Sequence, residues 1–246
     1  MLPRFYAPDL DPDMPRLTLP RDEAKHLTRV LRLAAGAEVS VFDGRGAEFR
    51  AEVEAAVRDT VSLRLIAALE VPPSPAVQVV VVQAVLKGQS MDDAVRDATM
   101  MGAEAIEPII TAHTDVKTSF AKRPETVERW RRIALSAVKQ SRRATLPSIA
   151  APRAFDEWTV TPSGAMKLIF VEPSAERARR GLKAALEHHV PARAEVLLGP
   201  EGGWADDELQ SALRSGCIPV TLGPLTLRAE SMAVAALAAL AAIWEV

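Results

Sequence analysis

The spacing of apolar and polar residues changes along the chain, and its first part is typical of strands. Over 16–19, 38–53 and 60–66 apolar side chains alternate with polar ones, as expected for strands with one buried face. The middle stretch contains Asp43-Gly44-Arg45-Gly46, which predicts a hairpin turn because glycine tolerates positive φ. An amphipathic helix is predicted at 23–33. We therefore expect residues 1–70 to form a small β-barrel suited to binding.

A proline-rich segment, Glu70-Val71-Pro72-Pro73-Ser74-Pro75, ends this pattern. Three prolines in four residues disfavour both helices and the interior of a sheet, so 71–75 is predicted to be a linker. Beyond it, strand and helix patterns alternate up to the C-terminus. Strands are predicted at 76–86, 105–110, 167–171, 195–198 and 218–222, and helices at 91–102, 124–144, 175–188, 205–215 and 229–244. This alternation predicts an α/β domain with a mainly parallel sheet over 76–246.

The composition is that of an ordinary globular protein, with 48% hydrophobic and 25% charged residues among 246. The single cysteine, Cys217, excludes an intrachain disulfide and fits a reducing compartment. The first ten residues lack the apolar core of a signal peptide, and the longest apolar run, 232–244, is too short to span a bilayer. We expect a cytoplasmic protein with no membrane contact. The histidines show no metal-ligand spacing with Cys217, so we expect no metal site.

The net charge of −2 conceals a basic segment. From Lys117 to Arg143 there are nine Lys/Arg against Glu125 and Glu128, a net charge of +7 that leaves −9 for the rest of the chain. Concentrated positive charge on an otherwise acidic protein favours a phosphate backbone as partner. A solvated helix face is the alternative interpretation.

Two glycine-containing loops follow predicted strands. "GPEGGW" at 199–204 follows 195–198, and "GPLTLRAES" at 223–231 follows 218–222. In open α/β sheets ligands bind beyond the carboxyl ends of the strands. Neither loop matches a dinucleotide fingerprint or a phosphate-binding loop. Each could be only a tight turn, but together they indicate a cofactor that is bound chiefly by main-chain groups.

These loops carry a family resemblance. "LLGPEGGWADDEL" at 197–209 and "LGPLTLRAES" at 222–231 resemble the C-terminal signature of the SPOUT methyltransferases. More narrowly they resemble the ribosomal small-subunit methyltransferase E family, which methylates N3 of a uridine in 16S ribosomal RNA. Segments 3–6, 26–33 and 42–49 resemble that family's N-terminal PUA-like barrel. Segments 87–109 and 137–147 resemble its middle motifs.

The resemblance implies a SPOUT-type α/β domain with a C-terminal trefoil knot, preceded by a PUA-like β-barrel. It also implies S-adenosylmethionine bound among the knot loops, and a homodimer built on the knotted domain. The apolar helix predicted at 229–244 independently favours burial on both flanks. The cofactor-binding residues implied by the resemblance are Leu198, Gly199, Pro200, Glu201, Gly202, Gly203, Leu222, Gly223, Leu225 and Leu227.

Two residues of the C-terminal motif are candidates for catalysis. Uracil N3 carries a proton, so a cation that stabilises the developing uracilate and a group that takes the proton would both assist. Arg228 and Glu230 are the candidates. Arg228 bridging the loops, and Glu230 interacting with the positive end of the last helix, are the structural alternatives.

The RNA-binding residues expected from the resemblance and from the basic segment are Arg4, His26, Arg29, Arg32, Lys139, Gln140, Arg142 and Arg143. Lys139 stands where the family usually has glutamate, and Arg142 where glycine is common. The expected partner is ribosomal RNA in the small subunit. Two other functions stay open at this point. One is a SPOUT enzyme with another RNA target, such as a ribose 2′-hydroxyl, and the other is a non-catalytic RNA-binding assembly factor.

Overall fold

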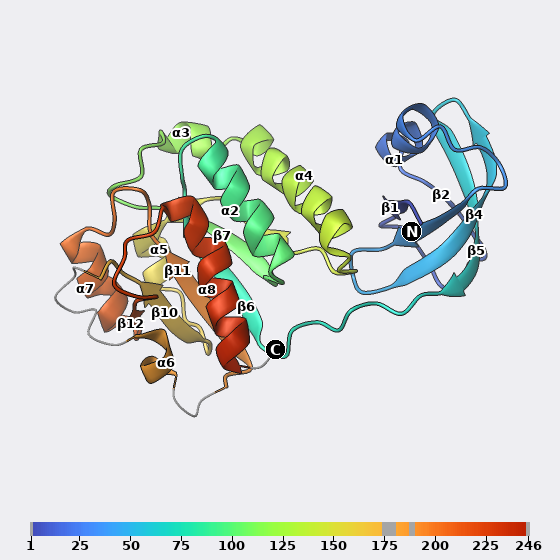
Figure 1. Ribbon diagram of the computed structural model, residues 1–246. Coiled ribbons are helices and arrows are strands. Elements are labelled where there is room, and N and C mark those ends of the chain that lie inside the picture. Colours follow the sequence, from blue (N-terminus) through green and yellow to red (C-terminus); the bar gives the residue numbers. More distant parts are fainter. Residues whose placement is uncertain (1, 174–180, 187–189, 245–246) are drawn as a thin grey trace. The chain divides into compact units, whose positions relative to one another are not determined.

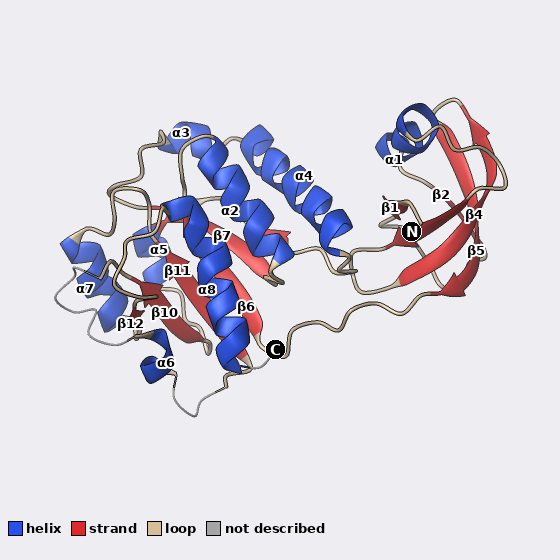
Figure 2. Cartoon of the chain, in the orientation of Figure 1, coloured by secondary structure: helices blue, strands red, loops and turns tan. Residues whose placement is uncertain are grey.

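The computed structural model describes residues 2–173, 181–186 and 190–244, and it divides into two compact units (Figures 1 and 2). The first comprises Met1–Ser74 together with Val138–Leu146, and the second comprises Pro75–Ala137 and Pro147–Val246. The boundary near Pro75 lies in the expected proline-rich segment. Residues 138–146 differ from the expected division, because the chain pattern placed them in the second domain.

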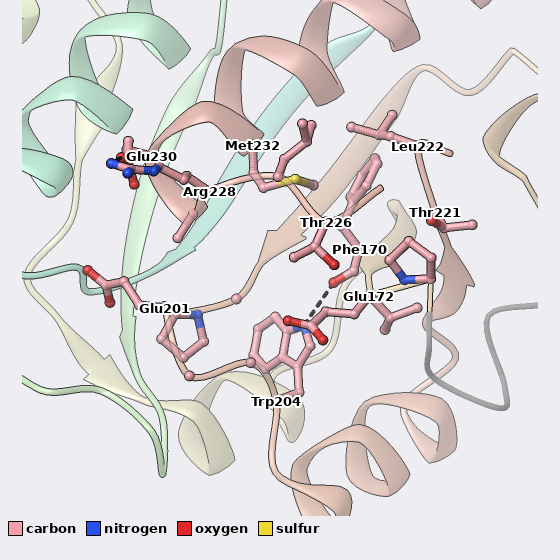
Figure 3. Close-up of a pocket in the computed structure, with 18 of the residues that line it drawn as sticks. Phe170, Glu172, Glu201, Trp204, Thr221, Leu222, Thr226, Arg228, Glu230 and Met232 are labelled. Carbon is pink, nitrogen blue, oxygen red and sulfur yellow. Dashed lines mark hydrogen bonds and ion pairs between the residues drawn. The ribbon is translucent and has the colours of Figure 1, made fainter. Parts of the chain in front are cut away.

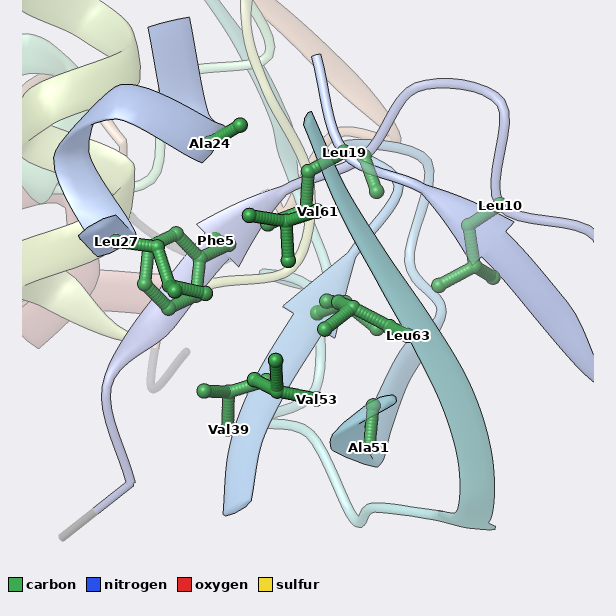
Figure 4. Close-up of a cluster of buried hydrophobic side chains, with 12 residues drawn as sticks. Phe5, Leu10, Leu19, Ala24, Leu27, Val39, Ala51, Val53, Val61 and Leu63 are labelled. Carbon is green, nitrogen blue, oxygen red and sulfur yellow. The ribbon is translucent and has the colours of Figure 1, made fainter. Parts of the chain in front are cut away.

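The first unit is a five-stranded sheet with a short helical segment. Its strands follow the order β1-β3-β4-β5-β2. Only β1 and β3 are parallel to each other. A cluster of buried apolar side chains lies between the strands and the helical segment and includes Phe5, Leu27, Val39, Val53 and Leu63 (Figure 4). The strands are β1 (Arg4–Tyr6), β2 (Arg16–Thr18), β3 (Glu38–Phe42), β4 (Glu48–Val57) and β5 (Thr60–Ala68).

The helix predicted at 23–33 ends earlier in the structure, at Val30, and its second half is a π-helical turn, which is wider than an α-helix. It consists of α1 (Arg21–Lys25) and a π-helical turn, η1 (His26–Val30). The Thr28 hydroxyl donates to the Ala24 carbonyl oxygen at 2.9 Å, a bond that competes with the main-chain ladder. Arg32 then adopts φ 53°, a left-handed conformation that ends the segment.

The second unit has a seven-stranded, all-parallel sheet. The strands follow the order β12-β10-β11-β6-β7-β8, and β9 pairs with β7. This confirms the predicted α/β class with a parallel sheet. The strands are β6 (Gln78–Ala84), β7 (Ala105–Ile110), β8 (Ser148–Ile149), β9 (Arg153–Ala154), β10 (Met166–Phe170), β11 (Arg193–Leu198) and β12 (Ile218–Val220). The helices are α2 (Gln89–Met100), α3 (Thr118–Ala121), α4 (Pro124–Ser141), α5 (Phe155–Thr159), α6 (Leu182–Ala185), α7 (Asp206–Arg214) and α8 (Ala229–Trp244).

Both faces of this sheet are covered, which explains the unbroken valine run of β6. Val80, Val82 and Ala84 belong to one apolar cluster with residues of α5 and α7. On the other side α8 packs against β11 and α2, and Figure 1 shows α2 and α8 crossing the sheet side by side. A strand that is buried on both faces needs apolar residues at every position.

Several predicted boundaries differ from the structure. The helix predicted at 124–144 ends at Ser141, because Arg142 takes φ 61°. This left-handed conformation favours glycine, in line with the glycine that is common in the family at this position. The helix predicted at 175–188 lies mostly outside the described residues, of which 182–185 form α6. Among the described residues, every helix is too short or too polar to cross a membrane.

Candidate functional site

A cavity of about 760 Å³ lies at the carboxyl ends of three neighbouring strands. Because β10 pairs with both β11 and β12, the loops that follow these strands converge at one edge of the sheet. The volume is in the range of small-molecule sites. Figure 3 shows side chains from all three loops and from the start of α8 around it. The lining includes 170–173, 199–204, 221–222 and 225–230.

The loop after β11 is shaped by Trp204. Its indole Nε1 donates to the carbonyl oxygen of Phe170 at the end of β10, at 2.9 Å (Figure 3). The ring thereby lies directly over Gly199, where an added Cβ would be 3.1 Å from Nε1. Gly203 takes φ 69°, which a larger residue adopts only with strain. The two glycines therefore let the main chain pass close beside a ring that is tied to the neighbouring strand.

The same loop is held from a second side by the segment that follows β7. The His113 Nδ1 lies 3.0 Å from the carbonyl oxygen of Gly202 and 3.1 Å from that of Gly203, and it donates because both partners are acceptors. A Cβ on Gly202 would lie 3.0 Å from the His113 Cβ. The main-chain N–H of Lys87 donates to Glu201 Oε1 at 3.0 Å. The loop geometry is thus fixed before any ligand binds.

Lys87, which follows β6, also contacts the segment after β7 through Asp115. Its Nζ lies 2.8 Å from Asp115 Oδ2. The hydrogen bond and the charge of Asp115 raise the pKa of Lys87, and those of Lys87 lower the pKa of Asp115. The pair is therefore fully ionised at neutral pH.

The charges around the cavity are mostly negative. Among the described lining residues, four are acidic, namely Glu172, Glu201, Asp206 and Glu230, and one is a cation, Arg228. The Arg228 side chain is 86% exposed, and its Nη1 lies 3.7 Å from Oε1 of Glu230, which is 24% exposed. The charge of the described lining is therefore net negative, which favours a ligand that carries positive charge.

Most of the residues expected at a cofactor site meet at this cavity. Gly199, Pro200, Glu201, Gly202, Gly203, Leu222, Leu225, Leu227, Arg228 and Glu230 all line it. Leu198 is fully buried behind the loop, and Gly223 is not among the lining residues. The sequence interpretation missed the segment 170–173 and His113. The predicted strand at 167–171 could have indicated residues 170–173, because its carboxyl end lies at the edge of the sheet that carries the cavity.

The residues expected to bind RNA belong to the first unit, and two of them are engaged inside it. The Arg4 side chain is 11% exposed. All five guanidinium N–H donors are used by Glu48 and by the carbonyl oxygens of Val138, Lys139 and Arg143. Arg4 thus binds the last carbonyls of α4, which lack partners within the helix. Lys139 forms an ion pair with Glu23, which is buried. A lysine at position 139 can neutralise the buried Glu23 carboxylate, whereas the glutamate that is usual in the family would repel it.

The other expected RNA-binding residues are more accessible. His26, Arg29, Arg32, Gln140 and Arg142 are exposed. Arg29 pairs with Asp59 at 2.5 Å, and Arg143 is half-buried and donates to the Thr145 hydroxyl at 3.0 Å. In the described part of the chain, no cluster of His, Cys, Asp or Glu could hold a metal ion.

Most of the chain matches two family models of RNA methyltransferases. Residues 72–241 match the family model of the RNA methyltransferase domain, and 19–66 match that of the RNA methyltransferase PUA domain. The ribosomal RNA small subunit methyltransferase E of Synechocystis sp. is 33% identical, over 93% of this chain and 74% of that protein. The protein of the same name from Mycobacterium bovis is 30% identical, over 96% and 89%.

Solved structures of similar proteins match the chain over almost its whole length. The ribosomal RNA small subunit methyltransferase E of Neisseria gonorrhoeae, bound to S-adenosylmethionine, superposes with a TM-score of 0.89 at 28% identity. The similarity covers 99% of this chain and 98% of that one. With these matches, the expected SPOUT-type α/β domain with a PUA-like N-terminal domain is confirmed. The glycine loops, the parallel sheet and the matches along the chain agree, and the protein belongs to the ribosomal RNA small subunit methyltransferase E family.

Proposed function

We propose that this protein transfers a methyl group from S-adenosylmethionine to N3 of a uridine in 16S ribosomal RNA. The observation that carries the proposal is the cavity bordered by Gly199–Gly203 and 221–230, in a family whose Neisseria member is bound to S-adenosylmethionine. The cofactor is a sulfonium cation, and the acidic lining of the cavity suits its charge.

The cofactor would be held chiefly by the two glycine loops. The main chain of Gly199–Gly203 borders the cavity, and its path is set by close packing, because a Cβ on Gly199 or Gly202 would press on Trp204 or His113. Leu222, Leu225 and Leu227 supply apolar surface from the other loop, as expected for an adenine ring. Leu198 supports the first loop from beneath, and Gly223 allows the turn of the second at φ 155°.

Arg228 and Glu230 are the proposed catalytic residues. The exposed guanidinium of Arg228 is available to a uracil at the rim of the cavity, where its charge would stabilise the developing uracilate. Glu230 holds the guanidinium on one side and is placed to receive the N3 proton, directly or through water. Bound S-adenosylmethionine supplies the electrophilic methyl group, so the protein's main task is to orient the uracil.

RNA and a second copy of the chain are the proposed partner molecules. The exposed side chains of His26, Arg29, Arg32, Gln140 and Arg142 would contact RNA, with Arg143 beside them, whereas Arg4 and Lys139 would position the end of α4. A homodimer is supported by Val234, Ala238 and Ala242, which form an exposed apolar stripe on α8 at i, i+4 spacing. We also propose the trefoil knot of the family and a cytoplasmic location, where the ribosomal substrate is made.

The function is tested by titrating the protein with S-adenosylmethionine in a calorimeter, followed by methyl transfer to unmodified small ribosomal subunits. We expect saturable binding and a new N3-methyluridine in the 16S RNA, detected by mass spectrometry of nucleosides. Binding without this product would redirect the assignment to another RNA target. Absence of binding would contradict the enzyme and support a non-catalytic RNA-binding protein.

Replacing Arg228 with alanine should lower kcat by roughly 100-fold, the usual effect of removing one charge-stabilising group, while the affinity for S-adenosylmethionine stays unchanged. Arg214→Ala on α7 is the matched control, since Arg214 is exposed and does not line the cavity. Single-turnover methylation and calorimetry measure the two quantities separately. Weaker cofactor binding in Arg228→Ala would instead identify Arg228 as a bridge between loops.

A further inference from the structure

We propose that Phe120 and Arg123, on the second unit, form a stacking platform for an unpaired base of the RNA substrate. The inference rests on the proposed function, because it takes single-stranded RNA as the ligand. It adds a base-binding site that lies outside both the cavity and the first unit.

The platform consists of one exposed aromatic ring with a guanidinium over it. Phe120, on α3, is 51% exposed. The guanidinium carbon of Arg123 lies 5.4 Å from the centre of its ring, which is within cation–π range. Aromatic rings accompanied by arginine are the usual binding groups for unpaired bases, because every base has a π face that can stack.

The ring is presented by a rigid segment. The Phe120 carbonyl oxygen accepts a bond from the Thr126 hydroxyl at 3.0 Å, and Ala121 beside it is completely buried. The main-chain N–H of Thr126 donates to the Arg123 carbonyl oxygen at 3.0 Å. These bonds join α3 to the first turn of α4, so an exposed apolar ring is held in place without being packed into the core. Such a preorganised ring loses little entropy on binding.

The charge around the ring is positive and unpaired. Lys117, Lys122 and Arg123 are all exposed. Within the described ranges, none of the three forms a salt bridge. By contrast, Arg129 and Arg131 on the following helix, α4, pair with Asp92 and Glu128. Unpaired cations beside a stacking ring would contact the phosphates that flank a stacked base.

The platform is connected to the cofactor loop. Residues 111–115 begin the segment that leads to α3, and His113 donates to the carbonyl oxygens of Gly202 and Gly203. Phe120 lies seven positions after His113 in the chain, which limits their separation to roughly 25 Å at about 3.5 Å per residue. A strand of RNA with its target uridine at the cavity could therefore reach Phe120 within a few nucleotides.

A protein partner fits this surface less well. Among the described residues of 111–123, Phe120 is the one large hydrophobic side chain that is exposed, and its neighbours are lysine, serine and threonine. The centre of a protein interface is typically depleted of lysine and has several apolar residues together. A single ring among cations matches a nucleobase and its phosphates.

The test measures the affinity of the full chain for a fluorescent oligouridylate of roughly 12 nucleotides, a length suited to single-strand binding. Stacking of one base contributes about 1–3 kcal/mol, so Phe120→Ala and Phe120→Leu should each weaken binding roughly 5- to 150-fold. Phe120→Trp should retain affinity, and its added fluorescence should be quenched by the RNA. Arg123→Gln should reduce the salt dependence by about one charge.

Val160→Ala is the matched control, because Val160 is an exposed apolar residue on the same unit, 79% accessible and outside the platform. Equal affinity of Phe120→Ala and this control would overturn the proposal. A changed oligomeric state of Phe120→Ala in light scattering would also overturn it, by placing the ring in a protein interface. Failure of the proposed function would show itself differently, as wild-type protein that binds no S-adenosylmethionine.

Discussion

Gly199→Ala is expected to weaken S-adenosylmethionine binding roughly 5- to 150-fold, because overpacking a well-filled site costs about 1–3 kcal/mol. The new methyl group would lie 3.1 Å from Nε1 and 3.2 Å from Cε2 of Trp204. The indole cannot retreat freely, since its N–H is bonded to the Phe170 carbonyl oxygen. Either this bond or the path of the loop must change, and both border the cavity. Calorimetric titration measures the effect directly.

Two further variants distinguish a steric clash between residue 199 and Trp204 from a general loss of folding. Gly164→Ala should bind the cofactor as the wild type does, because a Cβ at Gly164 meets no atom within 4 Å. Combining Gly199→Ala with Trp204→Phe should restore part of the affinity, since the smaller ring leaves room for the methyl group. If Gly199→Ala bound S-adenosylmethionine with wild-type affinity, the assignment of this loop to the cofactor would be wrong.

The second large effect is expected in the first unit. Arg4→Met should lower its free energy of unfolding by about 3–5 kcal/mol, the cost of removing one partner from a buried ion pair. Arg4 and Glu48 are each 11% exposed and lie 2.7 Å apart. The variant would leave Glu48 unpaired and would also free the carbonyl oxygens of Val138, Lys139 and Arg143. Segment 138–146 should then detach from the unit.

Hydrogen exchange of the β3 and β4 amides reports on this unit separately from the second one. Arg16→Met is the control, because Arg16 is 71% exposed and its pair with Glu54 is a surface ion pair, for which an effect below about 1 kcal/mol is typical. Should Arg4→Met prove too unstable to purify, Glu48→Gln tests the same pair. An exchange rate in Arg4→Met equal to that of the control would refute the structural role given to Arg4.

The sequence pattern indicated the role of Gly199 but not that of Arg4. Gly199 belongs to a motif whose position after a strand, together with the family resemblance, assigned it to a cofactor. Arg4 was expected to contact RNA because segment 3–6 resembles the family's PUA-like barrel. Its carboxylate partner is 44 residues away and its carbonyl partners are more than 130 residues away. A charge pattern along the chain cannot distinguish a buried cation from a solvated one, because the difference lies in groups that are distant in sequence.

The sequence by itself determined the elements and the edge at which the site lies. The continuous valine run at 76–86, the alternating strands of 16–66 and the loops at 199–204 and 223–231 are local signals. They follow from the side-chain periods of helix and strand and from the turns that glycine permits. Because the strands are parallel, their carboxyl ends lie at one edge of the sheet, which placed both loops at that edge.

Only the tertiary structure decided which groups complete the site and which domain each segment joins. The fixing of Gly202 by His113, the bond of Trp204 to Phe170 and the inclusion of 138–146 in the first unit each depend on pairings across long separations. The free energy of such contacts comes from burial and from satisfied hydrogen bonds. Neither quantity has a period along the chain, so the sequence pattern could not reveal them.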